Sequence, residues 1–205
     1  MKVALTIAIF SLLAGLAAER VSAAQRFDFK DPKGVNNITF RLDAPLEAIS
    51  GSTAGVSGEV EFDPANPGAL KGRLVVATET LHVPNPMMKQ HLHSDKWLDV
   101  AKHPEISFRV AKVASVKTVE TETKAEITGD LSIKGVTKSL TVPVRLTYLK
   151  DKLSARLPNM QGDLLVLRAS FTIKRSDFGI NPGQAEEKVS DEIELKLSLA
   201  GQCPK

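Results

Sequence analysis

The chain has 205 residues and a formal net charge of +3, and aromatic residues make up only 5% of it. A chain of this length fits a single domain. A nearly balanced, aromatic-poor sequence offers neither the basic surface nor the stacking side chains of a nucleic-acid-binding protein. We therefore expect one folded domain and no nucleic-acid partner.

The first 24 residues have the layout of a Sec-type signal peptide. Lys2 precedes an apolar stretch from Val3 to Ala18, and small residues follow up to Ala24. This order of positive start, apolar centre and small residues is typical of a cleaved export signal. An uncleaved anchor is disfavoured, because the stretch is shorter than the roughly 20 residues of a membrane span. We expect cleavage near Ala24 and a soluble periplasmic protein formed by residues 25–205.

Short strand-like runs separated by turn signals make up the rest of the chain. Apolar and polar residues alternate in each run, as in Ile38, Phe40 and Leu42. Because successive side chains of a strand point to opposite faces, each run has one apolar face. The glycine-rich stretch 50–58 is interpreted as a loop. About eight strands and a ninth are expected, at 26–30, 36–43, 56–62, 71–79, 105–113, 124–133, 139–149, 163–175 and 189–199.

The segment near residues 87–101 departs from this alternation. Met88, Leu92 and Leu98 have helical spacing, and Ser94 or Asp95 could cap a second turn. We expect one or two short helices across one end of the sheet, and a loop over residues 150–162.

The alternation predicts an all-β fold, namely an antiparallel β-barrel of about eight strands. Closing the sheet removes its edges, and a barrel of this size can hold one small ligand. Alternation alone does not decide whether side chains or a ligand fill the interior. The residues expected in the lumen are Phe40, Phe62, Val76, Ile106, Phe108, Leu131, Ile133, Val144, Phe171, Ile173 and Leu197.

Three segments together resemble the YceI-like family of exported lipid-binding proteins. They are residues 91–94 with 97–99 and 103–108, residues 129–138, and residues 175–180 with 189–193. The resemblance implies an extended lipocalin-like barrel whose apolar lumen takes a polyisoprenoid or a related long-chain lipid.

The sequence departs from the family pattern at three positions. Lys89 stands where the family usually has aspartate, His93 where it usually has arginine, and Asn37 near where an early strand often carries a histidine-serine pair. If these positions lie at the mouth of the barrel, head-group recognition is altered while lumen binding is less affected.

Three basic or titratable residues are candidates for contacting a lipid head group: His91, His93 and Arg175. Arg175 has the same strand parity as Phe171 and leans towards the lumen at a strand end. A buried arginine needs a partner. An ion pair with Asp177 is favoured over an anionic ligand.

Neither a metal site nor an active site is expected. The histidines are His82, His91, His93 and His103. No cysteine or close carboxylate would complete a coordination sphere. Thr53 stands where a nucleophile elbow needs serine, in a stretch expected to be a flexible loop. We expect no cofactor and no enzymatic activity, and an esterase or redox enzyme is the weakest hypothesis.

The leading hypothesis is a protein that binds and sequesters or carries a long-chain amphiphilic lipid in the bacterial periplasm. Under this hypothesis the protein can also contact a membrane transiently or form a homodimer, and the sequence decides neither. The alternative is a packed-barrel interaction or stress-defence protein of the cell envelope, without a lipid ligand, whose helical segment around Trp97 docks a partner. Cys203, the only cysteine, is expected to be idle on a frayed tail, with an intermolecular disulfide as the alternative.

Overall fold

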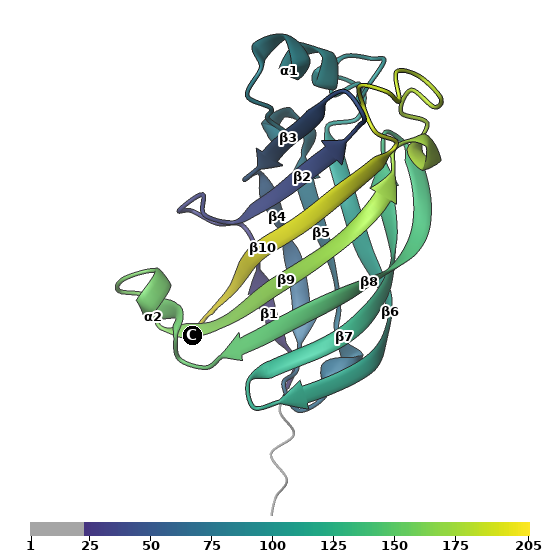
Figure 1. Cartoon of the computed structure of the whole chain (residues 1–205). Helices are drawn as coiled ribbons and strands as arrows, with labels where there is room; N and C mark the ends of the chain where they lie inside the picture. Colours follow the sequence, from purple (N-terminus) through teal and green to yellow (C-terminus); the bar gives the residue numbers. More distant parts are fainter. Residues whose placement is uncertain (1–22) are drawn as a thin grey trace, which may run out of the picture.

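The computed structural model describes residues 23–205, so the predicted signal peptide lies outside the described residues except for Ala23 and Ala24. Ten strands form one antiparallel sheet that curls into a barrel (Figure 1). The strands are β1 (Gln25–Asp28), β2 (Asn37–Asp43), β3 (Ala48–Thr53), β4 (Val56–Phe62), β5 (Lys71–Ala77), β6 (Glu105–Val119), β7 (Glu122–Ile133), β8 (Val136–Leu149), β9 (Gly162–Lys174) and β10 (Glu192–Pro204). The helices are α1 (Pro86–His93) and α2 (Leu153–Arg156), with 3-10 turns η1 (Pro67–Ala69), η2 (Thr78–Thr80) and η3 (Ser176–Phe178).

Eight of these strands make a closed ring in the order β1-β4-β5-β6-β7-β8-β9-β10. The ring closes where Asp28 of β1 lies opposite Gln202 of β10. Further along β10, residues 194–198 pair instead with β2, and β3 extends the sheet beyond β2. The expected lipocalin-like antiparallel barrel of about eight strands is therefore confirmed, with the β2–β3 hairpin added to it.

The expected loop over residues 50–58 is wrong except at Ala54 and Gly55, because residues 50–53 belong to β3 and residues 56–58 to β4. A Cβ atom at Gly51 would lie 2.2 Å from the Phe40 ring, and one at Gly58, where φ is +112°, would lie 2.2 Å from the Arg73 carbonyl oxygen. Glycine inside a strand often marks a close approach of neighbouring groups. Gly51 and Gly58 therefore relieve crowding within the sheet and do not mark a turn, whereas Gly55 lies in the short connection between the strands. Thr53 lies in a strand.

The helical segment is shorter than expected. α1 begins after Asn85, whose side-chain oxygen accepts hydrogen bonds from the N–H groups of Met87 and Met88 at 2.9 and 3.1 Å. After His93 the chain makes turns only, and Asp99 has a φ of +48°. Ser94, with φ −68° and ψ 166°, is extended and ends α1. Of the one or two short helices expected here, only α1 is present, and residues 95–98 form turns in place of a second helix. The loop expected over 150–162 contains the short helix α2. No helix within residues 23–205 has the length and apolarity to cross a membrane.

Cys203 does not lie on a frayed tail, because β10 runs to Pro204 and places Cys203 opposite Asp163 of β9. Its side chain is half-buried against the barrel interior. Burial raises the pKa of the Cys203 thiol, and the nearby Asp163 carboxylate raises it further. Since the thiolate is the reactive form, this environment disfavours disulfide exchange at neutral pH.

Two buried apolar clusters lie towards opposite ends of the barrel interior. The cluster remote from α1 contains Phe27, Phe62 and Leu165 among its members. The other cluster, at the end that carries α1 (top of Figure 1), contains Leu131 and Ile133 together with side chains from the covering loops. Members of both clusters also line the interior cavity described below, which lies where the two clusters face each other.

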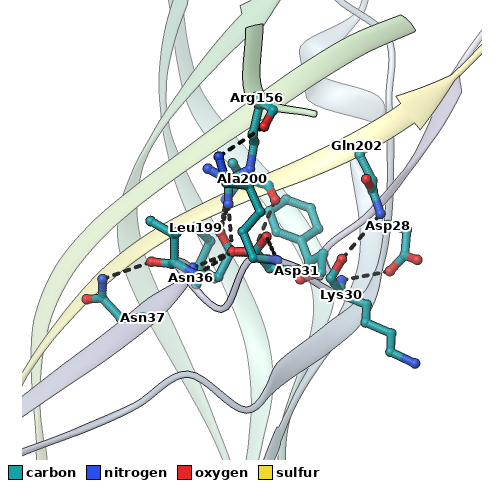
Figure 2. Close-up of polar contacts among 12 residues, drawn as sticks. Asp28, Lys30, Asp31, Asn36, Asn37, Arg156, Leu199, Ala200 and Gln202 are labelled. Carbon is teal, nitrogen blue, oxygen red and sulfur yellow. Dashed lines mark hydrogen bonds and ion pairs between the residues drawn. The ribbon is translucent and has the colours of Figure 1, made fainter. Parts of the chain in front are cut away.

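A buried polar network holds the segment between β1 and β2 against β10 (Figure 2). The Asn36 amide donates to the Phe29 and Ala200 carbonyls at 3.0 and 3.1 Å, and its oxygen accepts from the Ala200 N–H at 2.8 Å. The Arg156 guanidinium donates to Asp31 at 2.7 Å and to the Asn36 oxygen at 3.1 Å. The network lies at the point along β10 where its neighbour changes from β2 to β1. Through Arg156, it also connects α2 to this part of the barrel.

Asp31 gives the protein an acid-sensitive contribution to stability. Burial raises the pKa of this carboxyl, but N–H donors from Asn36, Lys33 and Val35 and the charge of Arg156 lower it more, so the net shift is downward. A folded-state pKa below the unfolded value stabilises the fold at neutral pH, and this stabilisation is lost as the pH falls below about 4.

We therefore expect Asp31→Asn to lower the free energy of unfolding by about 1–3 kcal/mol at pH 7. The difference from the parent should shrink at pH 3. Urea titrations at the two pH values measure both quantities. Asp43→Asn, at an exposed carboxylate, is the matched control and should have little effect at either pH. An Asp31→Asn penalty that is equal at both pH values would contradict the assignment.

Candidate ligand-binding cavity

A cavity of about 220 Å³ lies inside the barrel between the two clusters. One buried water needs only about 10–15 Å³ of such volume, and an apolar cavity of about 150 Å³ can hold benzene. The polar residues on the lining are Thr53, Arg73 and Arg175, and nearly all the others are apolar. An apolar chain is therefore the kind of ligand that this space suits.

The side chains around the cavity are less buried than those of a packed core. Their Cα positions face one another across the ladders, as Phe171 faces Leu195 and Leu74 faces Phe108. Half-buried inward residues occur on β5, β6, β9 and β10: Leu74, Val76, Ile106, Phe108, Val110, Phe171, Ile173, Ile193, Leu195 and Leu197. In a close-packed interior such side chains would contact other atoms on all sides. Their partial exposure indicates an unfilled lumen.

Ten of the eleven residues expected in the lumen line this cavity: Phe40, Val76, Ile106, Phe108, Leu131, Ile133, Val144, Phe171, Ile173 and Leu197. Phe62 does not. It is 1% exposed and belongs to the cluster remote from α1, where its ring centroid lies 6.4 Å from that of Tyr148. Phe62 is the last residue of β4, so correct strand parity places it inward but below the cavity.

The covering loops supply lining residues that the strand pattern did not predict. Leu92 of α1, then Trp97 and Leu98 in the following turns, line the cavity together with Leu81 and Ile180. The helical spacing of Leu92 and Leu98 was visible in the sequence. Their direction was not, because it depends on how the segment crosses the end of the barrel. Trp97 is half-buried and lines the cavity, so less of its indole surface is exposed for the partner docking that the alternative hypothesis assigns to this segment.

Arg175 is fully buried and lines the cavity next to Trp97, with its guanidinium carbon over the indole ring, 5.8 Å from the ring centre. The expected ion pair with Asp177 is wrong. The guanidinium donates instead to five backbone carbonyls of the segment that follows it: Ile180, Asn181, Gln184, Val189 and Ser190.

These carbonyls come from a loop that wraps around the guanidinium and so replaces a carboxylate partner. Arg175 has five N–H donors, and the five bonds can use all of them. A head group could therefore sense Arg175 by its charge but would find no free N–H. The proposed head-group role of Arg175 stays a prediction, and the visible role of the side chain is to hold the 176–190 loop over the barrel.

The histidines lie at separate places. His93 Nε2 is 2.9 Å from the Leu81 carbonyl oxygen, His91 is exposed at the end of α1, and the His103 ring packs near Gly135. His82 forms an isolated bridge with Ser52. Among residues 23–205 no three histidine, cysteine or carboxylate side chains are grouped as metal ligands are. Head-group contacts by His91 and His93 stay predictions.

The three departures from the family pattern are not all at one end. Lys89 and His93 lie on α1, over the covered end of the barrel. Asn37 begins β2 and its side chain donates to the Val35 carbonyl at 3.1 Å, beside the polar network of Figure 2. Only the two α1 positions are therefore placed where a head group at that end could reach them.

The barrel wall is incompletely hydrogen-bonded between β8 and β9. These strands pair only from Val144 opposite Ala169 to Leu149 opposite Leu164. Within the described chain, residues 136–143 of β8 pair with β7 alone and residues 170–174 of β9 pair with β10 alone. Pro143, which has no N–H to donate, directly precedes the first β8–β9 pair. Both strands carry cavity-lining residues along this unsealed stretch, among them Val142 and Phe171.

The chain is similar to known proteins over nearly its whole length. Residues 30–200 match the YceI-like domain family. A UPF0312 protein of Pseudomonas aeruginosa is 31% identical over 194 residues, which cover 93% of this chain and 95% of that protein. A UPF0312 protein of Pectobacterium carotovorum is 29% identical over 202 residues, covering 98% and 96% of the two chains.

Two solved structures share the fold. Burkholderia cenocepacia BcnA superposes with a TM-score of 0.65 at 22% identity, covering 80% of this chain and 95% of its own. A polyisoprenoid binding domain from Saccharophagus degradans superposes with a TM-score of 0.64 at 12% identity, covering 88% and 99%. At these identities the likeness is one of architecture.

Proposed function

The chain belongs to the YceI-like domain family, and from this premise we propose that it binds a long-chain amphiphilic lipid in its barrel cavity. The observation that carries the proposal is the apolar cavity ringed by half-buried aliphatic and aromatic side chains. The polyisoprenoid binding attributed to the Saccharophagus degradans domain supports an isoprenoid chain as the ligand.

Apolar burial supplies the affinity in this proposal. Each buried CH₂ contributes about 0.8 kcal/mol, so ten such groups contribute about 8 kcal/mol, which corresponds to micromolar binding before ordering costs are subtracted. A few isoprene units reach this length. Polar groups on α1, including Lys89, His91 and His93, would then act on the head group alone.

The proposed activity is sequestration or carriage of the lipid without chemical change. The described cavity lining offers Thr53, Arg73 and Arg175 as its polar residues, and Arg175 is held by backbone carbonyls. General acid–base chemistry uses histidine or carboxylate groups within hydrogen-bond reach of the substrate. The packed-barrel alternative is disfavoured by the cavity itself.

The proposed location is the bacterial periplasm. Its support is the signal-like sequence up to Ala24, together with the position of Gln25 as the first residue of β1. Cleavage after Ala24 would remove the leader and leave the barrel strands whole. A transient membrane contact would allow such a protein to load and unload its ligand.

Native mass spectrometry of the protein isolated from its own periplasm tests both proposals in one measurement. We expect a polypeptide that begins at Gln25 or within a residue or two of it, carrying an additional hydrophobic mass that organic extraction removes. A chain that retains Met1 in the membrane fraction would refute export with cleavage. Periplasmic protein without added mass that also fails to take up a prenyl or fatty-acyl probe would refute lipid binding.

A further inference from the structure

Four cations lie in a row across the outer face of the barrel, one on each of β6, β7, β8 and β9. The strand register places Lys117 opposite Lys124, Lys124 opposite Arg145, and Arg145 opposite Arg168. All four residues are exposed. Neighbouring strands lie about 4.8 Å apart, so the row spans about 14 Å. We call these four residues the basic row.

The surroundings of the basic row neutralise it only in part. Glu122 lies 3.7 Å from both Lys124 and Arg145, so one carboxylate is shared between two cations. Arg168 has no ion-pair partner among residues 23–205 and donates to the Leu167 and Leu199 carbonyls instead. Burial lowers the pKa of Arg168, and the charges of Arg145 and Arg156 lower it further.

Like charges directly opposite one another destabilise a sheet. The arrangement therefore carries a cost that an external anion would relieve. The row stands on the outer face of the barrel and extends over about 14 Å, so an extended anionic surface can contact more of its cations at once than a single small anion can.

The basic row lies beside the unsealed stretch of the barrel wall. Arg145 and Arg168 form the pair next to Val144 and Ala169, where the β8–β9 ladder ends, and these last two residues line the cavity. At the other end of the row, Val119 lies close to Lys117 and is 60% exposed. Basic residues with apolar neighbours are the composition that binds at a membrane interface.

We propose that the basic row docks the protein on an anionic phospholipid bilayer, with the unsealed β8–β9 stretch beside the lipid. This inference rests on the proposed function, because a lipid-binding barrel must exchange its ligand with a membrane. A basic residue close to an anionic bilayer strengthens association by about fivefold. Four such residues give binding that salt weakens, because the screening length falls from about 30 Å at 0.01 M salt to about 8 Å at 0.15 M.

Vesicle sedimentation of the mature protein tests the proposal. The vesicles contain phosphatidylglycerol mixed with phosphatidylcholine, or phosphatidylcholine alone. We expect the parent protein to sediment with the anionic vesicles at low salt, to be released by added salt, and to remain free of the neutral vesicles. The triple variant Lys124→Gln, Arg145→Gln and Arg168→Gln should bind anionic vesicles at least tenfold more weakly, given about fivefold per cation.

A second triple variant is the matched control. Arg26→Gln, Arg41→Gln and Lys71→Gln removes the same charge from exposed positions on β1, β2 and β5, away from the row. It should sediment nearly as the parent does. Equal loss of binding in both triple variants would show that net charge alone attracts the protein, and would overturn the assignment.

Uptake of a fluorescent prenyl probe from solution separates this inference from the proposed function. Both triple variants should take up the probe as the parent does, which also shows that they are folded. A parent protein that takes up the probe but ignores anionic vesicles at low salt would refute the docking surface and leave lipid binding intact. Binding to polyglutamate without binding to vesicles would assign the row to an acidic protein and overturn the membrane as its partner.

Discussion

Ala169→Trp should weaken uptake of a prenyl or fatty-acyl probe by about 100-fold, while the lipid-free protein stays nearly as stable as the parent. Ala169 is half-buried on β9, faces Val144 and Leu197 across the ladders, and lines the cavity. An indole at this position can occupy the cavity of about 220 Å³. Displacing four CH₂ groups of a ligand costs about 3 kcal/mol of binding free energy, which corresponds to a roughly 100-fold loss of affinity. Probe titration and thermal unfolding of delipidated protein measure the two effects.

The same substitution distinguishes a hollow barrel from a packed one. In a packed interior the added ring would cost about 1–3 kcal/mol or more in stability, because a close-packed core has no space for it. Ser170→Trp, the neighbouring position on the outer face, is the control and should alter neither property strongly. A large drop in melting temperature at Ala169→Trp with unchanged probe affinity would refute the lumen as the binding site.

Arg175→Leu should destabilise the protein by about 3–5 kcal/mol, the largest stability effect that we expect of a single substitution. The change removes a buried cation and leaves up to five carbonyl oxygens of the 180–190 segment without their donors. For a protein of this size, that loss lowers the melting temperature by about 6–20 °C. Differential scanning calorimetry gives both values.

Two further variants define what Arg175 contributes. Arg175→Lys keeps the charge but not the planar set of five donors, so it should recover only a minor part of the lost stability. Lys174→Leu, one residue away and exposed, should change the free energy of unfolding by less than about 0.5 kcal/mol. A loss below 1 kcal/mol for Arg175→Leu would show that the loop does not depend on these bonds.

Strand parity was readable from the sequence because it depends on local geometry alone. A two-residue repeat places Phe108, Leu131 and Phe171 on one face whatever the neighbouring strands are, and all three line the cavity. Phe62 obeys the same parity yet misses the cavity, because height along the barrel is set by register and shear between strands. Sequence reasoning had no access to that register.

The glycines of β3 and β4 show a second limit. A side chain at Gly51 would collide with the Phe40 ring, and one at Gly58 would collide with the Arg73 carbonyl oxygen. Phe40 lies on β2, next to β3, and Arg73 lies on β5, next to β4, so both are far from these glycines in the sequence. In the sequence the same glycines are indistinguishable from turn residues. For this reason the interpretation of residues 50–58 as a loop failed everywhere except at Ala54 and Gly55. The ninth expected strand is β10, which pairs along its length with β9 and in parts with β2 and β1.

The sequence by itself determined the alternating apolar faces, the antiparallel all-β class and the family, because each depends on local periodicity or on motifs within short segments. The tertiary structure alone decided which of those faces enclose a cavity, how the loop carbonyls surround Arg175, and that Lys117, Lys124, Arg145 and Arg168 stand side by side. Each of these features joins residues from separate strands or loops. Their meeting is set by inter-strand register and by loop packing, and no local pattern encodes either one.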